Sequence, residues 1–181
     1  MKVIDTAIEG VKVIEPEVFG DARGYFFEVW NRAKFAEAGI EVDFVQDNES
    51  FSTYGVLRGL HYQMPPYTQA KLVRVISGTV LDVVVDIRKG SPTFGKNVGV
   101  ELSGENKRQL FAPRGMAHGF AVLSATATFA YKCDNIYAPS HERSIRFNDP
   151  DLAVNWQIPP ENYLLSDKDR KGVPFTEAEY L

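Results

Sequence analysis

The sequence has few of the residues that stabilise proteins through covalent or metal cross-links. Its 181 residues include one cysteine, Cys133, and three histidines. A single cysteine cannot form an internal disulfide, which is typical of proteins in a reducing compartment. A chain of this length can bury a full hydrophobic core without such cross-links. We therefore expect one domain spanning residues 1–181.

The sequence also lacks long apolar runs and a strong excess of one charge. It has no stretch of about 18 apolar residues, and its first residues, Met1 to Asp5, lack the apolar core of a signal peptide. The net charge of −4 comes from interspersed signs, which argues against non-specific nucleic-acid binding. We expect a cytoplasmic protein with no membrane or nucleic-acid partner.

Short β-branched and aromatic segments between glycine or polar turns dominate the chain. Two of them, residues 71–76 and 80–87, flank Ser77-Gly78. Further strands are predicted at residues 97–102, 108–111, 119–123, 126–132 and 144–147. Only residues 32–38, which stop at Gly39, are clearly typical of a helix. Many strands and few short helices predict an all-β sandwich or small barrel that can hold one small ligand.

A first cluster of unusual residues contains a histidine between two cations. Arg58 and His61 are followed by Gln63, and Lys71 begins the next predicted strand. Residues two apart share a face of a regular strand, so His61 and Gln63 would point the same way, although Gly59 leaves that regularity open. A base between two cations suits an anionic substrate that must lose a proton. The alternative is a buried structural histidine with solvated cations.

A second cluster, Pro113-x-Gly115-x-x-His118, is a turn that carries a histidine into an apolar strand. Taken alone, His118 is as typical of a buried, hydrogen-bonded core residue as of a functional one. The remaining histidine, His141, lies in a polar stretch and is given no role.

Together the two clusters resemble the two motifs of the cupin superfamily. Gly55, five residues, His61-x-Gln63, then Lys71, six residues and Gly78 follow the first motif with a longer gap. The resemblance implies a cupin-type jelly-roll β-barrel. Gln63 stands where the superfamily has a metal-binding histidine and Lys71 where it has a carboxylate, and an ammonium group repels a divalent cation. We therefore expect no metal and no other cofactor.

Longer strings narrow the resemblance. They are residues 21–28, 46–48, 58–63, 85–88, 131–133 and 165–169, in that order. From about Val3 to about Pro174 the chain resembles the dTDP-4-dehydrorhamnose 3,5-epimerase family. Asn97 departs from the family pattern, where a tryptophan is expected, but it lies outside the catalytic strings. The resemblance implies a cofactor-independent isomerase that epimerises dTDP-4-keto-6-deoxy-D-glucose at C3 and C5, through an enolate, to dTDP-4-keto-L-rhamnose.

The resemblance also implies a role for each site residue. His61 would be the base, oriented by Asp169, with Lys71 stabilising the enolate oxygen and Tyr131 returning the proton from the opposite face. Without the resemblance, Tyr131 is more typical of core packing and Asp169 of a solvated acid. The nucleotide-linked sugar would contact Arg23, Phe26, Glu28, Gln46, Asp47, Asn48, Arg58, His118, Tyr137, Glu142 and Lys168.

Within that set, the arginines suit phosphate oxygens, Phe26 suits stacking on thymine and Glu28 can accept the thymine N–H. The resemblance further implies a homodimer in which the amino-terminal strand joins the partner's sheet. Arg23, Phe26 and Glu28 would then serve the neighbouring subunit's site.

Three alternatives stay open. A single-carbon epimerase or a ketoisomerase on a related nucleotide-linked keto sugar would differ at a few pocket positions. A non-catalytic sugar-nucleotide-binding cupin would not need His61, Lys71, Tyr131 and Asp169 together. A metal-dependent dioxygenase would carry stoichiometric iron. The pathway's end product, L-rhamnose for a surface polysaccharide or an antibiotic sugar, is not determined by these residues.

Overall fold

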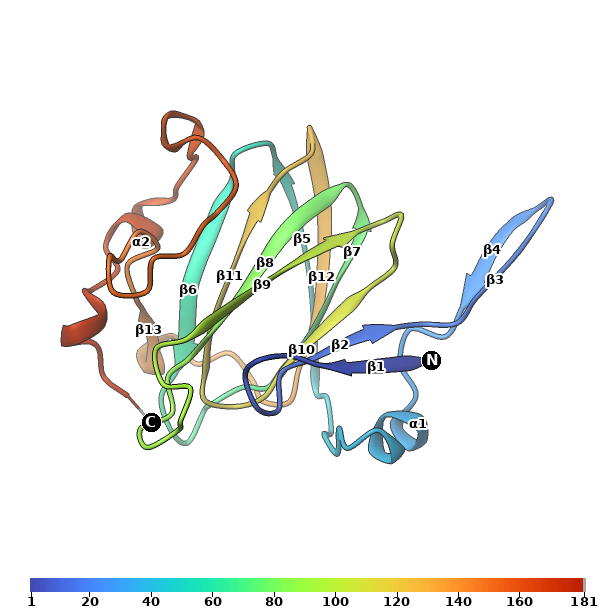
Figure 1. Cartoon of the computed structure of the whole chain (residues 1–181), viewed down its shortest axis with the longest axis horizontal. Helices are drawn as coiled ribbons and strands as arrows, with labels where there is room; N and C mark the ends of the chain where they lie inside the picture. Colours follow the sequence, from blue (N-terminus) through green and yellow to red (C-terminus); the bar gives the residue numbers. More distant parts are fainter. Residues whose placement is uncertain (181) are drawn as a thin grey trace.

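Two antiparallel sheets face each other in the computed structural model, which describes residues 1–180 (Figure 1). Six strands form one sheet, in the order β1 (Lys2–Asp5), β2 (Lys12–Glu15), β10 (Gln109–Ala112), β7 (Lys71–Ser77), β12 (Thr126–Cys133) and β5 (Gln46–Thr53). The other sheet has five, in the order β13 (Glu142–Ser144), β6 (Leu57–Gln63), β11 (Met116–Val122), β8 (Thr79–Asp86) and β9 (Asn97–Ser103). This arrangement confirms the predicted all-β jelly-roll class.

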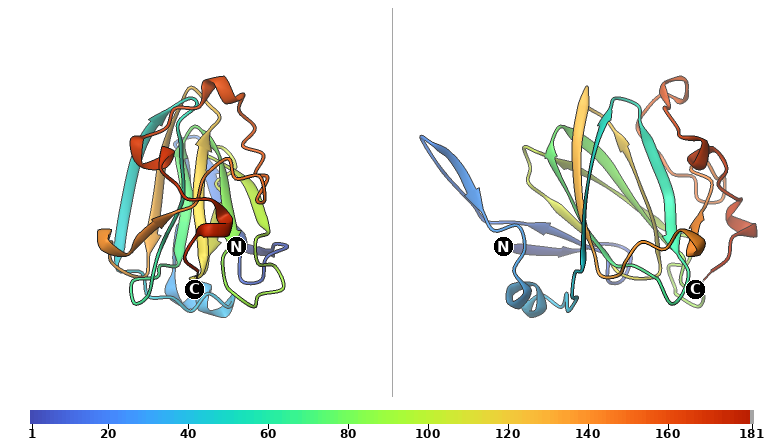
Figure 2. Two further views of the ribbon diagram at one scale, coloured as in Figure 1. Left: turned by 90° about the vertical axis from the view of Figure 1, so that its left-hand side faces the viewer. Right: turned by 180° about the vertical axis from the view of Figure 1, so that it is seen from behind.

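A separate hairpin of β3 (Val18–Asp21) and β4 (Gly24–Phe27) projects from the barrel (Figures 1 and 2). The α-helices are α1 (Arg32–Glu37) and α2 (Asp167–Arg170), and three short 3-10 turns lie at Pro139–His141, Pro160–Asn162 and Phe175–Glu177. None of the helices within residues 1–180 has the length and apolar character needed to cross a membrane.

Alternation along β8 shows how the two faces of the five-stranded sheet are filled. Val80 and Val84 pack between the sheets, in one core with Phe129 of the opposite sheet. Leu81 points the other way, into a second core that includes Trp156 of the C-terminal segment. This segment therefore covers the outer face of the five-stranded sheet, as the red and orange chain in Figure 2 shows. A third core around Phe35 of α1 covers only part of the outer face of the six-stranded sheet.

A β-bulge between β6 and β11 sets the direction of the residues nearest the first histidine. Arg58 pairs with Phe120 across the two strands. The next pair joins His61 to His118, so two residues of β6 lie opposite Gly119 alone. As a result Arg58 and His61 lie on the same face of the sheet, which a regular strand does not allow for residues three apart.

The bulge requires glycine on both strands. Gly59 has a φ of +133°, and a Cβ there would lie 2.5 Å from the Cα of Gly119. A Cβ on Gly119 would in turn lie 2.6 Å from the carbonyl oxygen of Arg58. Any side chain at either position would push β6 away from β11.

Most predicted strands are confirmed, and the helix at 32–38 is observed as α1. The segment around His61, left open by Gly59, is strand β6. The predicted bounds 144–147 were wrong, because β13 spans Glu142–Ser144. Strands β1 to β5 were not predicted, since the first four have only four residues each and β5 is mostly polar.

We expect Gly119→Ala to lower the free energy of unfolding by about 1–3 kcal/mol, because the added methyl group overlaps the β6 backbone. Urea denaturation measures this change. Gly20→Ala is the control, since a Cβ there meets only the Gly24 carbonyl oxygen at 3.6 Å. Equal unfolding midpoints for Gly119→Ala and the unmodified chain would show that β6 can move without cost.

Candidate active site

A cavity of about 330 Å³ lies between the two sheets, and most of the predicted site residues line it. Its wall contains Gln46, Asn48, Arg58, His61, Lys71, Tyr131, Tyr137, Glu142 and Lys168, together with Tyr62, Gln63, Gln69 and Cys133. His61 comes from the five-stranded sheet, whereas Lys71 and Tyr131 come from the six-stranded sheet. The predicted base and the predicted acid therefore occupy opposite walls of one cavity.

His61 is in contact with Asp169 of the C-terminal segment. His61 Nε2 lies 2.8 Å from Asp169 Oδ1, and the side chains are 23% and 4% exposed. The approach is not aligned with the ring N–H direction, so Nε2 is buried without a well-directed hydrogen bond. Because Nε2 is turned toward the carboxylate, Nδ1 is the ring nitrogen that remains for a substrate.

The carboxylate of Asp169 is fixed from two further directions. Its oxygens accept hydrogen bonds from the backbone N–H of Gly59 at 3.1 Å and from the Ser166 hydroxyl at 2.5 Å. Ser166 is also the N-cap of α2, where its oxygen accepts the N–H of Asp169. Burial acts to raise the pKa of Asp169, but its contacts with His61, Ser166 and Gly59 lower that pKa to about 2. Asp169 is therefore ionised at neutral pH.

Lys71 and Tyr131 stand next to each other on the opposite wall. The Lys71 ammonium lies 5.9 Å from the centre of the Tyr131 ring. Burial lowers the pKa of Lys71, while the carboxylates of Asp82 and Glu142 act against this shift. Burial also raises the pKa of Tyr131, so its phenol is protonated at neutral pH. This wall thus places a buried lysine amine beside a protonated phenol.

Three polar side chains form a connected group at the cavity. Lys168 Nζ lies 2.5 Å from one oxygen of Glu142, and the Tyr137 hydroxyl donates to the other at 2.8 Å. Burial acts to raise the pKa of Glu142, but Lys168 and Tyr137 lower it overall. The Glu142 carboxylate therefore holds a cation and an aromatic ring at one side of the cavity.

His118 lies in the barrel interior next to His61, not in the cavity wall. The residue is 7% exposed, and its Nε2 lies 2.9 and 3.0 Å from the two carboxylate oxygens of Asp82. Its ring stacks on Phe129. In the single chain His118 is thus a buried, hydrogen-bonded histidine, which matches the structural alternative.

Asp47 does not point into the cavity. Gln46 and Asn48 line it, so the alternation of β5 turns Asp47 to the outer face of the sheet. There it lies 2.9 Å from the ammonium group of Lys132.

The other three predicted contacts belong to the projecting hairpin and the chain just after it. Phe26 is 70% exposed. Arg23 pairs with Asp21 at 2.5 Å, and Glu28 lies 2.9 Å from Lys34. Figure 2 shows the hairpin extending away from the sheets. A single chain therefore does not bring these residues to its own His61.

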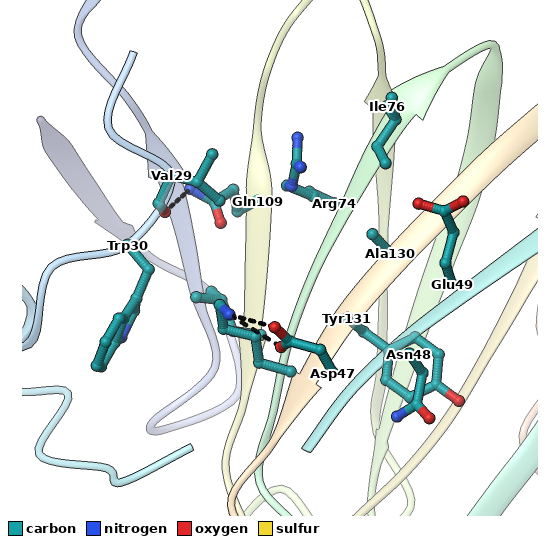
Figure 3. A pocket seen from close by; sticks show the side chains of 12 residues that line it. Val29, Trp30, Asp47, Asn48, Glu49, Arg74, Ile76, Gln109, Ala130 and Tyr131 are labelled. Carbon is teal, nitrogen blue, oxygen red and sulfur yellow. Dashed lines mark hydrogen bonds and ion pairs between the residues drawn. The ribbon is translucent and has the colours of Figure 1, made fainter. Parts of the chain in front are cut away.

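A larger cavity of about 520 Å³ lies on the outer face of the six-stranded sheet (Figure 3). Charged side chains such as Glu49 and Arg74 line it beside Trp30 and Ile76. Neither histidine nor cysteine occurs in its wall. We therefore assign the proton chemistry to the smaller cavity, which contains His61.

Four wall residues were not predicted as catalytic or substrate-binding, namely Tyr62, Gln63, Gln69 and Cys133. Cys133 follows Tyr131 by two positions on β12, so strand alternation could have placed it in the cavity. Burial raises the pKa of its thiol to about 11, so it is protonated at neutral pH. Gln69 lies in a loop, where no periodicity signals its direction. Within residues 1–180, no group of three or more His, Cys, Asp or Glu side chains is arranged to hold a metal ion.

Known proteins share this fold and sequence over nearly the whole chain. The family model for dTDP-4-dehydrorhamnose 3,5-epimerase matches residues 5–177. A dTDP-4-dehydrorhamnose 3,5-epimerase from Shigella flexneri is 58% identical, over 100% of this chain and 99% of the relative. The epimerase structure from Legionella pneumophila in complex with dTDP-4-keto-L-rhamnose is 52% identical, with a TM-score of 0.95 and coverage of 98% of this chain and 94% of that chain.

A more distant relative is named as an epimerase of a single carbon. The structure of a 3′-monoepimerase from Streptomyces bikiniensis in complex with dTDP-quinovose is 36% identical, with a TM-score of 0.87 over 94% of this chain and 86% of that chain. The full-length family match and the high identity to several 3,5-epimerases nonetheless agree. The chain belongs to the dTDP-4-dehydrorhamnose 3,5-epimerase family.

Proposed function

We propose that this chain epimerises dTDP-4-keto-6-deoxy-D-glucose at C3 and C5, giving dTDP-4-keto-L-rhamnose. The observation that carries the proposal is the placement of a His61–Asp169 pair and a Lys71–Tyr131 pair on opposite walls of one cavity. Membership of the family supports the choice of substrate. The reaction belongs to L-rhamnose synthesis, and a single free cysteine, Cys133, suits work in the cytoplasm.

In the proposed reaction, neutral His61 removes the proton from a carbon next to the ketone. The electron pair of that C–H bond moves into an enolate, whose oxygen is stabilised by the ammonium group of Lys71. Tyr131 then donates its phenolic proton to the opposite face of the same carbon, and the ketone forms again. His61 then releases its proton to solvent, and Tyr131 takes up a proton from solvent. No electrons are gained or lost overall, so the reaction needs no redox cofactor.

Asp169 acts in this scheme through His61. Its negative charge stabilises the imidazolium ion that forms when His61 takes the proton. Arg58, Gln46, Asn48 and Lys168 line the same cavity and supply donors for the diphosphate. Phosphate binding by Lys168 would compete with its present contact to Glu142.

We also propose that the chain works as a homodimer with strand exchange. A two-stranded hairpin alone is marginally stable in water, yet β3–β4 exposes Phe19, Tyr25 and Phe26 at 57–70%. The outer face of the six-stranded sheet is also partly uncovered, with Phe51 66% exposed. Docking of the hairpin on a second copy would cover these side chains and carry Arg23, Phe26 and Glu28 to the partner's cavity.

In deuterated water, the unmodified chain is expected to introduce deuterium at both C3 and C5, as followed by proton NMR of the nucleotide-linked sugar. His61→Ala should slow exchange at both carbons by at least about 10²-fold, because the base is lost. His141→Ala is the control, since His141 does not line the cavity.

Exchange at one carbon alone would make the chain a single-carbon epimerase. Full exchange by His61→Ala would refute the assignment of the base. Loss of activity in chelator, restored only by iron or zinc, would refute the cofactor-independent scheme.

Asp169→Asn is expected to lower kcat by about 10²–10⁴-fold, because the imidazolium ion loses its counter-charge. It should also lower the free energy of unfolding at pH 7 by about 2 kcal/mol, since the folded pKa of Asp169 is about 2 against an ordinary 3.8. A depressed pKa stabilises the fold above about pH 4, and the stabilisation is lost as the pH falls toward 2. The difference between variant and unmodified chain should therefore shrink over that window.

Urea denaturation from pH 7 to pH 2 and steady-state kinetics measure these effects. Asp167→Asn on the same helix is the control and should change neither quantity appreciably. A constant stability difference across the whole pH range would contradict the assigned ionisation of Asp169.

Mixing two inactive variants tests the exchanged hairpin. If Arg23 serves the partner's site, co-refolded Arg23→Ala and His61→Ala chains form heterodimers in which one site carries both lesions and the other carries none. Random association then restores about a quarter of the sites. If Arg23 acts in its own subunit, every site keeps a lesion and the mixture stays inactive. Light scattering on the unmodified chain gives the oligomeric state.

A further inference from the structure

The side chain of Gln63 ties two loops together at the cavity. Its Nε2 donates hydrogen bonds to the carbonyl oxygens of Tyr67 at 2.6 Å and Ile136 at 3.1 Å. Its Oε1 accepts the backbone N–H of Ala138 at 2.7 Å. The residue is 5% exposed, so this small amide joins the 64–67 turn to the 135–138 segment in the interior.

These three bonds leave Gln63 little capacity to bind a substrate directly. A glutamine amide has two N–H donors, and both are used on loop carbonyl groups. Any effect of Gln63 on the reaction must therefore pass through the backbone that it holds.

The segment held by Gln63 carries Tyr137. Two more side chains hydrogen-bond to the backbone of the 135–138 segment. Gln46 accepts the N–H of Tyr137 at 3.0 Å, and Gln69 donates to the carbonyl oxygen of Asn135 at 2.8 Å. No strand or helix includes residues 135–138. Because sheet hydrogen bonds are missing there, these side-chain bonds determine where Tyr137 stands.

Tyr137 in turn contacts Glu142 through its hydroxyl group, and Glu142 contacts Lys168. One buried amide thus helps to fix the loop from which Tyr137 contacts Glu142, whereas Glu142 and Lys168 themselves are carried by β13 and α2. The position of Gln63 corresponds to a metal-binding histidine in the cupin motif that the sequence resembles. Here that position supports the wall of the site.

We propose that Gln63 is a positioning residue that holds Tyr137 and the neighbouring wall in the arrangement that binds the nucleotide-linked sugar. This inference rests on the proposed function for its substrate. Because the hydrogen bonds of the Gln63 amide go to Tyr67, Ile136 and Ala138 and not to the His61–Asp169 pair within residues 1–180, its loss affects binding much more than the chemical step.

The test compares Gln63→Glu and Gln63→Leu with the unmodified chain. Glu keeps an acceptor for Ala138 but turns a carboxylate oxygen toward two carbonyl oxygens, whereas Leu loses all three bonds. Both variants should raise KM, and the Kd for dTDP measured by calorimetry, by about tenfold or more. The rate of carbon-bound deuterium exchange at saturating substrate should stay within about threefold.

A double-mutant cycle with Tyr137→Ala distinguishes positioning from general loosening of the fold. If Gln63 acts through Tyr137, replacing Gln63 in the Tyr137→Ala background should change the Kd for dTDP by less than about twofold. Asn97→Asp is the matched control, because its amide donates to the Leu152 carbonyl oxygen at 2.7 Å outside the cavity. Thermal melting confirms that each variant is folded.

An unchanged Kd for dTDP in folded Gln63→Glu would overturn this proposal, as would fully additive effects in the cycle. A saturating rate that falls as steeply as Kd rises would assign Gln63 to the chemical step instead. Because dTDP binding is measured without turnover, these results are independent of the epimerisation itself. Failure of the unmodified chain to exchange carbon-bound protons would refute the proposed function alone.

Discussion

The contact between the His61 imidazole and the Asp169 carboxylate is the interaction on which the cavity depends. A buried carboxylate is stable only where hydrogen-bond donors or cations compensate its charge. Asp169 accepts hydrogen bonds from Gly59 of β6 and from Ser166 at the N-cap of α2, and it contacts His61 of β6. The Gly59 N–H is available because the bulge removes it from the regular ladder. One irregularity therefore turns Arg58 to the side of His61 and supplies the Gly59 N–H to the carboxylate that contacts His61.

The sequence predicted the central strands well because burial on both faces leaves a clear chemical signal. Strand β8, with one face in each core, is almost entirely β-branched or leucine. Strand β5 gave no such signal, since one face lines a polar cavity and the other is largely exposed, so both faces carry polar residues. The sequence also could not predict that the side chains of Arg58 and His61 lie on the same face of the sheet, because this depends on contact with Gly119 on a strand distant in sequence.

Most of the candidate site residues line the cavity, although their roles stay predictions, and they were identified on a different basis from the strands. The ordered motifs named residues on strands and loops alike, including Glu142 and Lys168, whose contact no periodicity implies. The motifs did not indicate which way each side chain points. Asp47 lies between two cavity residues and faces outward. Gln63 was recognised as a lost metal ligand, but its three bonds to loop backbone could be seen only once the loops were placed.

Single-carbon and two-carbon epimerases can share the same catalytic groups, because C3 and C5 both flank the C4 ketone. A base on one wall and an acid on the other can act on either carbon if the carbonyl oxygen stays near Lys71 while the ring changes its orientation. The second epimerisation therefore requires a second binding mode of the sugar ring, not another base. Product choice therefore depends on the groups that hold the sugar and nucleotide. The side chains around Tyr137, and the hairpin if it docks on a second copy as proposed, are then more important for product choice than His61 or Tyr131.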